Sequence, residues 1–273
     1  MLDPARSIAL GLLLASIAAC DDPSDSATVD TQAGISPAAV RWVLDWGHVS
    51  THQQGFELVT DLGYRVRVEA GWIGSWGVTL VECPEQGEER EATIELPVAS
   101  PWLIAEGHSS GEDDPSAWVF AGVESLTERR VVEADPIEAL DAHYCEVHYL
   151  LAPISEASEG FSAAADALAQ FDPEASLVGA SVLIFGSWEP PEGGKATPFV
   201  LRSEQAYGKI LALDISAAQL ESADVEVVLR RELAGMFDQV ELASAAPEDV
   251  AWQVLGNLAE QAIASAEVPD HRP

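Results

Sequence analysis

The sequence predicts a mainly β fold: an antiparallel β-sandwich with a C-terminal α-helix and one short internal helix. Short apolar segments separated by turn-forming residues recur along most of the chain, as they do in sandwiches. Several of these segments alternate apolar and polar residues, which is typical of half-buried strands. Residues 159–171 are rich in alanine and could form a short helix, although their apolar spacing is weak, and helix-like spacing is found in residues 247–264. Regularly alternating βαβ units are therefore not expected.

The expected strands are residues 40–46, 56–59, 64–68, 72–81, 118–123, 129–132, 177–186, 199–202, 210–214 and 225–229. In the expected strand at residues 72–81, Gly74 shares a face with Trp72 and Trp76, which indicates close approach of another segment or a bulge. The terminal helix begins near Pro247, where proline is tolerated in the first turn. Its apolar residues follow at three- and four-residue steps.

Residues 143–153 are expected to form a central buried strand. Their alternation places Cys145 and Val147 on an apolar face that points inward, and Glu146 and His148 on the opposite face. Cys83 ends another apolar strand and is the expected disulfide partner of Cys145. The bond would close a loop of 62 residues (145 − 83), which in the chain-entropy picture stabilises the fold by roughly 4 kcal/mol.

The N-terminus has the features of a targeting signal. Arg6 precedes an apolar run at residues 8–17, which is too short to span a bilayer as a helix. It ends in Ile-Ala-Ala-Cys at residues 17–20, which resembles a bacterial lipoprotein signal peptide with its lipobox. The resemblance implies cleavage before Cys20, a diacylglycerol on its sulfur and an acyl chain such as palmitate on its amine. An ordinary secretory signal with a nearby cysteine is the alternative.

These features predict the organisation of the chain. Residues 1–19 form the signal peptide, and residues 20–37 comprise the lipidated cysteine and a disordered tether without large apolar residues. Residues 38–268 form the sandwich domain with its helix, and residues 269–273 are a tail. The protein is expected in the bacterial cell envelope, held to a membrane by its N-terminal lipid. Outside the cytoplasm the remaining two cysteines should pair.

The charge is strongly negative, with 13 basic and 46 acidic residues and a net charge of −33. Removal of residues 1–19 leaves that value unchanged, because Asp3 and Arg6 leave together. Nucleic-acid binding is excluded, since it needs a basic surface. The negative charge either keeps the protein soluble or produces an electrostatic field that concentrates cations near its surface. The sequence also lacks Gly-x-Ser-x-Gly, His-Glu-x-x-His and phosphate-binding glycine loops, so no enzymatic activity is expected.

Histidine is the remaining source of chemistry, since five of the six histidines precede residue 149. If the loops that hold them gather at one pole, imidazoles rimmed by carboxylates form a site suited to copper or zinc. The candidate ligands are His48, His52, His108 and His143, with Glu146 and His148 as further contributors. The alternative is scattered solvent-exposed histidines on a structural, adhesive or ligand-binding sandwich without a metal.

Several stretches share a wider pattern: residues 64–83, Tyr-Cys-Glu-Val at 144–147, residues 177–186, Thr-Pro-Phe-Val-Leu at 197–201, and residues 225–229 leading to Met-Phe-Asp at 236–238. Together they resemble a loose family of bacterial cell-surface lipoproteins with transthyretin-like or MbnP-like β-sandwich domains. The resemblance spans most of residues 40–260. In the MbnP-like branch it implies a role in copper handling at the cell surface or in the periplasm.

Overall fold

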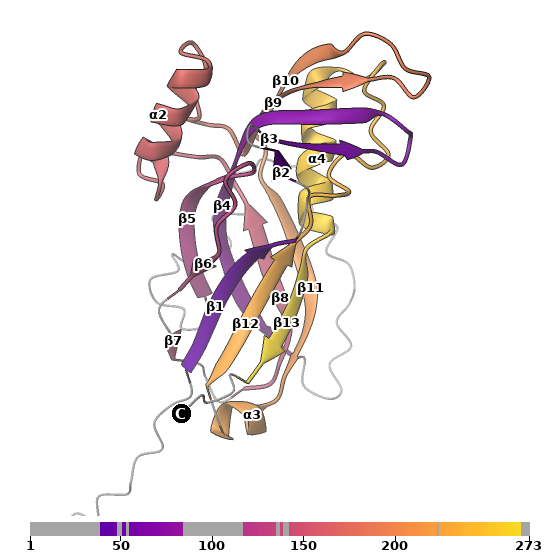
Figure 1. Ribbon diagram of the computed structural model, residues 1–273. Helices are drawn as coiled ribbons and strands as arrows, with labels where there is room; N and C mark the ends of the chain where they lie inside the picture. The colour runs from indigo at the N-terminus through magenta and orange to yellow at the C-terminus, as the bar shows by residue number, and fades with distance from the viewer. Residues whose placement is uncertain are drawn as a thin grey trace, which may run out of the picture. The chain divides into compact units, whose positions relative to one another are not determined.

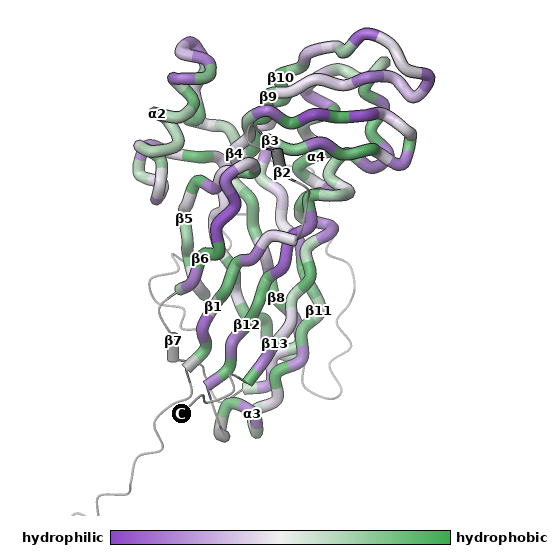
Figure 2. The backbone as a smooth tube through the Cα atoms, in the orientation of Figure 1, coloured by the Kyte–Doolittle hydropathy of each residue, from purple (hydrophilic) through white to green (hydrophobic). Residues whose placement is uncertain are grey.

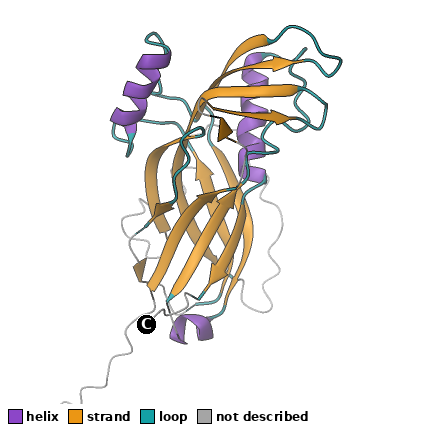
Figure 3. Ribbon diagram, viewed as in Figure 1, coloured by secondary structure: helices purple, strands orange, loops and turns teal. Residues whose placement is uncertain are grey.

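The computed structural model describes residues 39–47, 51–52, 55–83, 117–134, 137–138, 142–222 and 224–268 (Figure 1). These residues form a mainly β structure with two sheets and three helices (Figure 3). No helix among them is long and apolar enough to cross a membrane. The predicted signal peptide, the predicted lipidation site Cys20, the predicted tether and the predicted tail at residues 269–273 lie outside the described residues.

The described strands are β1 (Ala39–Trp46), β2 (Thr51–His52), β3 (Gly55–Val59), β4 (Arg65–Glu82), β5 (Ala117–Ser125), β6 (Val132–Glu133), β7 (Ile137–Glu138), β8 (Tyr144–Leu151), β9 (Val182–Glu189), β10 (Thr197–Ser203), β11 (Tyr207–Ile215), β12 (Val225–Arg231) and β13 (Ile263–Glu267). The helices are α2 (Phe161–Phe171), α3 (Ala217–Ser222) and α4 (Pro247–Glu260).

The smaller sheet has the order β13-β12-β1-β6, with β7 also paired to β1. Its central pair, β1 and β12, is parallel, with Trp42 opposite Val227 and Trp46 opposite Arg231. The expectation of a purely antiparallel sandwich is therefore wrong at this pair. The two strands are far apart in sequence, and the connection between them passes through the larger sheet, so no tight turn fixes them as antiparallel neighbours.

The larger sheet is organised by β4, an 18-residue strand that serves two sets of neighbours. Its first half pairs with β3 and β9, and its second half with β5 and β8. A register shift separates Ser75 from Gly77 in the pairing with both β5 and β8. A Cβ atom on Gly74 would lie 2.1 Å from the carbonyl oxygen of Ala152. The glycine therefore permits the close backbone approach that its position in the sequence indicates.

Two of the three described helices pack on different parts of the larger sheet. Helix α2 packs beside β5, and α4 packs against β10 and β11 (Figure 1). Helix α4 has Pro247 at its start, as expected, but ends at Glu260 rather than at residue 264. The following residues, Ile263–Glu267, instead pair with β12 as the edge strand β13.

The short helix α3 was not predicted, although Ser216 and Gln219 form a reciprocal capping box at its start.

The principal core lies between the two sheets and extends under α4. Both β1 and β12 contain apolar runs interrupted by charged residues (Figure 2). Their inward residues Trp42, Leu44, Val227 and Leu229 are almost fully buried. A second, smaller apolar cluster lies under α2 and includes Trp72, Leu168 and Phe185.

Candidate functional site

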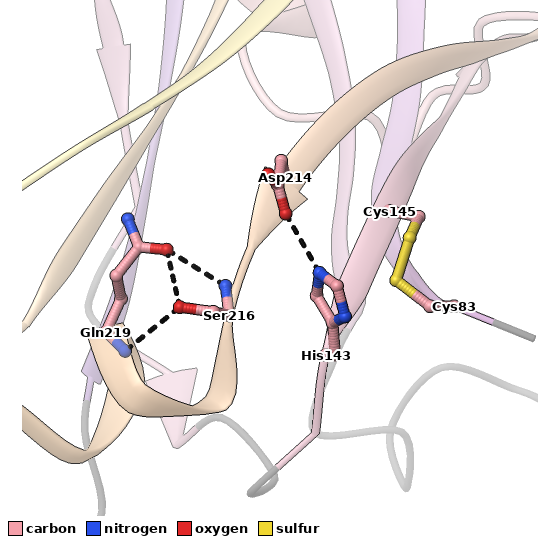
Figure 4. The surroundings of a disulfide bond; sticks show 6 residues. All are labelled: Cys83, His143, Cys145, Asp214, Ser216 and Gln219. Carbon is pink, nitrogen blue, oxygen red and sulfur yellow. Dashed lines mark hydrogen bonds and ion pairs between the residues drawn. A yellow bond between two sulfur atoms is a disulfide. The ribbon is translucent and has the colours of Figure 1, made fainter. Parts of the chain in front are cut away.

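The disulfide between Cys83 and Cys145 is confirmed, with Cα atoms 5.0 Å apart (Figure 4). The expected direction of Cys145 needs correction. The ladder between β4 and β8 pairs Glu82 with Tyr144 and Val81 with Glu146, so Cys145 is an extra residue in a bulge. The bulge turns Tyr144 into the core, where it is fully buried, and leaves Cys145 only half-buried.

His143 lies beside this disulfide. Its Nε2 atom is 2.8 Å from Oδ1 of Asp214, the residue that precedes the end of β11. Its carbonyl oxygen accepts a 2.8 Å hydrogen bond from the backbone N–H of Cys83. One ring nitrogen of His143 and the two sulfur atoms lie within 4.8 Å of one another. This Cys/His/Cys group could hold a metal, although the two cysteines are bonded to each other.

Among the described residues, the structure does not add another predicted ligand to the Cys/His/Cys group. His52 is in β2, which joins β3 next to the start of β4, whereas Tyr144 pairs with Glu82 at the end of β4. About thirteen residues of β4 separate the two levels, which is roughly 40 Å along an extended strand. Glu146 and His148 are half-buried on β8, opposite Val81 and Thr79. His48 and His108 lie outside the described residues.

A second feature, which was not predicted from the sequence, is a buried ion pair between Arg231 and Glu124. Arg231 has no exposed surface and Glu124 only 7%. Nη1 of the guanidinium is 2.5 Å from Oε1 of the carboxylate, and Nη2 is 2.7 Å from Oε2, so the contact is bidentate. Such geometry is the strongest form of a side-chain ion pair. It links β12 of the smaller sheet to β5 of the larger one.

Two further side chains complete the coordination of the carboxylate. The hydroxyl of Ser75 donates to Oε1, and the indole N–H of Trp46 donates to Oε2 at 3.2 Å. Each oxygen thus accepts two hydrogen bonds, which fills the roughly four acceptor positions of a carboxylate. The guanidinium carbon of Arg231 also lies 3.9 Å above the centre of the Trp46 ring, a cation–π contact.

The surroundings keep Glu124 ionised. Burial by itself would raise the pKa of Glu124, but the charge of Arg231 and the hydrogen bonds from Arg231, Ser75 and Trp46 outweigh it and lower the pKa. The pKa of Tyr149, which is buried in the same region, is raised chiefly by burial. The centre of the fold therefore contains a fixed, neutralised pair of charges.

A cavity of about 380 Å³ opens beside this pair, between β5 and α2. Aromatic side chains form much of its wall, and three alanines of α2 form the facing side. The aromatic residues are Trp46, Trp72, Phe120 and Phe171. Glu124 reaches the cavity, and Glu128, Glu159 and Arg130 also line it. The volume lies within the range of small-molecule binding sites.

The strand pattern does contain a signal for the ion pair. The inward face of β12 runs through Val225, Val227 and Leu229 to Arg231. The inward face of β5 likewise runs through Phe120 to Glu124. A charged residue in phase with the buried face of each strand indicates a buried pair, because an unpaired charge there would be costly.

Comparison with models of protein families, with curated proteins and with solved structures finds no match for the chain. The function must therefore be inferred from the two features above, the aromatic cavity beside the ion pair and the Cys/His/Cys group.

Proposed function

We propose that the chain is a lipid-anchored protein of the bacterial cell envelope whose β domain binds a small, mainly apolar ligand in the cavity between β5 and α2. The observation that carries this proposal is the aromatic cavity itself, which combines apolar walls with a rigid polar floor. Binding sites of this kind are typically preformed, apolar and furnished with a few fixed polar groups. The lipid anchor rests on the lipobox-like residues 17–20.

The charges around the cavity define the ligand further. The carboxylate of Glu124 is fully used by protein donors, so it offers no strong acceptor to a ligand. Glu128 and Glu159 outnumber Arg130 among the remaining charged lining residues, and the whole chain is strongly acidic. We therefore expect a neutral or cationic molecule, with its apolar body against the tryptophans and any positive group toward the acidic rim.

A pair of fluorescent probes tests this proposal. Each would carry the same naphthalene body, one with an ammonium group and one with a sulfonate. We expect saturable binding of the ammonium probe at one site per chain, at least tenfold tighter than the sulfonate at low salt. Added salt should reduce this preference, because it screens the acidic rim. Equal binding of both probes would contradict the charge argument.

Two alanines of α2 provide a matched pair of variants. Both Ala163 and Ala169 are exposed on this helix, but only Ala163 lines the cavity. Ala163→Phe should fill part of the cavity and weaken binding at least tenfold, and Ala169→Phe should leave it unchanged. If both variants bind like the wild type, the ligand lies elsewhere and the proposal is wrong.

Binding of copper or zinc is the second candidate, supported by the histidine-rich first half of the chain and by the Cys/His/Cys group. Calorimetric titration of the oxidised protein with Cu(II) and Zn(II) in moderate salt tests it. A site built from the loop histidines should give stoichiometric binding that is lost in His48→Ala or His108→Ala and weakens as imidazoles protonate at low pH. Binding that salt abolishes and these substitutions leave intact would instead be adsorption to the acidic surface.

A further inference from the structure

We infer that Cys83, Cys145 and His143 form a redox-gated site for a zinc-like divalent cation, which is closed while the disulfide is intact and opens when it is reduced. This inference rests on the proposal of metal binding, to which it adds a donor set and a condition. It does not depend on the cavity. The group is the one place among the described residues where three possible donors lie within 4.8 Å of one another.

The disulfide blocks the site because a bonded sulfur is a poor ligand, whereas a thiolate is a strong one. A dithiol reductant would open it by exchange: the sulfur–sulfur bond of the protein breaks, both cysteines become thiols, and the reductant is oxidised to its own disulfide. Both cysteines are half-buried, which leaves the bond within reach of such a reductant. Zinc would then bind two thiolates and displace two protons.

The fold should hold the two thiols together after reduction. Cys83 follows the end of β4 and Cys145 lies at the start of β8, and these strands are paired along most of β8. The hydrogen bond from Cys83 N–H to the carbonyl oxygen of His143 fixes the two segments independently of the sulfurs. A preformed pair of thiolates needs little ordering when the metal arrives, because the ladder has already restricted the chain.

His143 supplies the third donor, and Asp214 orients it. The carboxylate contacts one ring nitrogen, and Figure 4 shows Asp214 and the disulfide on different sides of the ring. This is the arrangement in which a metal-bound histidine donates its other N–H to a carboxylate. Two cysteines and one histidine leave a fourth tetrahedral position open to water. The donor set favours zinc over magnesium or calcium, which prefer oxygen.

The test uses the full chain with Cys20→Ser, so that Cys83 and Cys145 hold all remaining thiols. Cobalt(II) reports thiolate coordination through its charge-transfer absorption, and zinc(II) should displace it. We expect one cobalt per reduced chain and no thiolate absorption in the oxidised chain. His143→Ala should weaken zinc binding at least tenfold, and Asp214→Asn by about 10- to 100-fold. His271→Ala, at the one histidine of the sequence that is outside the candidate ligands, should bind like the parent.

Three results would overturn the inference. The first is metal binding of equal affinity in the oxidised and reduced chains. The second is a reduced chain that binds cobalt equally well with and without His143. The third is loss of the β-sheet circular dichroism signal on reduction, since the site requires the paired strands. If the first result is found and the binding also fails in His108→Ala, the loop-histidine site is supported in place of this one.

Discussion

Replacement of Arg231 by methionine should destabilise the fold far more than the same replacement at its neighbour. Arg231→Met removes the guanidinium from a site without solvent exposure and leaves Glu124 buried without its counter-charge. Breaking a buried ion pair from one side costs about 3–5 kcal/mol. Arg230, next along the same strand, is 58% exposed and contacts Asp45 at 3.6 Å. Loss of such a surface pair costs at most about 1 kcal/mol.

The measurement is urea-induced unfolding followed by circular dichroism, with the disulfide intact. A shift of the midpoint at constant slope reports the change in the free energy of unfolding. Glu124→Gln should cost a similar amount, because it leaves Arg231 charged and buried. The loss of free energy of unfolding in the double variant Glu124→Gln/Arg231→Met should be at least ~1.5 kcal/mol smaller than the sum of the losses in the two single variants. Such non-additivity is expected for residues in direct contact. A loss below 1 kcal/mol in Arg231→Met, or one equal to that in Arg230→Met, would refute the reasoning.

Three more predictions follow from other features of the chain. The pKa of Glu124 is lower in the folded protein than its ordinary value of 4.5. The ionised carboxylate therefore stabilises the fold fully above pH 4.5, and this contribution is lost as the pH falls through the lowered pKa of the folded protein. The free energy of unfolding should fall more steeply in acid for the wild type than for Glu124→Gln. Cys20→Ser should release the protein from the membrane fraction, and unchanged association would contradict lipidation. Burial, with the hydrogen bond and charge of Glu260, raises the pKa of Tyr207 to about 12; Glu260→Gln should lower it toward 10, as measured by carbon NMR of the phenol ring, and an unchanged value would refute the pairing.

Local periodicity predicted much of the secondary structure, because the spacing of apolar residues along the chain reflects the buried face of a strand or helix. It identified the strands at both ends of β4, the first part of the buried β9 and helix α4, whereas α2 was predicted from its alanine content. It failed where the conformation of a segment depends on pairing with a strand that is distant in the sequence. The bulge at Cys145 depends on the register with β4, and β13 forms because β12 offers an edge to Ile263–Glu267. The predicted helix ran to residue 264 and so included the first two residues of β13.

The candidate sites were predicted less well than the fold, for a related reason. The pairing of Cys83 with Cys145 could be predicted because the folded part offers only these two cysteines. Convergence of the histidines could not, because spacing along the chain does not show which strand ends meet. Glu124 and Arg231 were hidden among 46 acidic and 13 basic residues. These two residues differ from the other charged residues in being buried. Their burial could be predicted only by following the alternation of inward and outward residues along each strand as far as the charged residue.

The ion pair and the cavity are connected through Trp46, which gives a last prediction. This side chain lines the cavity, donates to Glu124 and stacks under Arg231. Arg231→Met removes the stacking partner and loosens the carboxylate that holds the indole N–H, so one wall of the cavity should lose its fixed position. We expect the ammonium probe to bind several-fold more weakly to Arg231→Met, and equally well to Arg230→Met and the wild type, when all three are measured under conditions that keep them folded. Unchanged affinity in Arg231→Met would show that the pair stabilises the sheets without shaping the cavity.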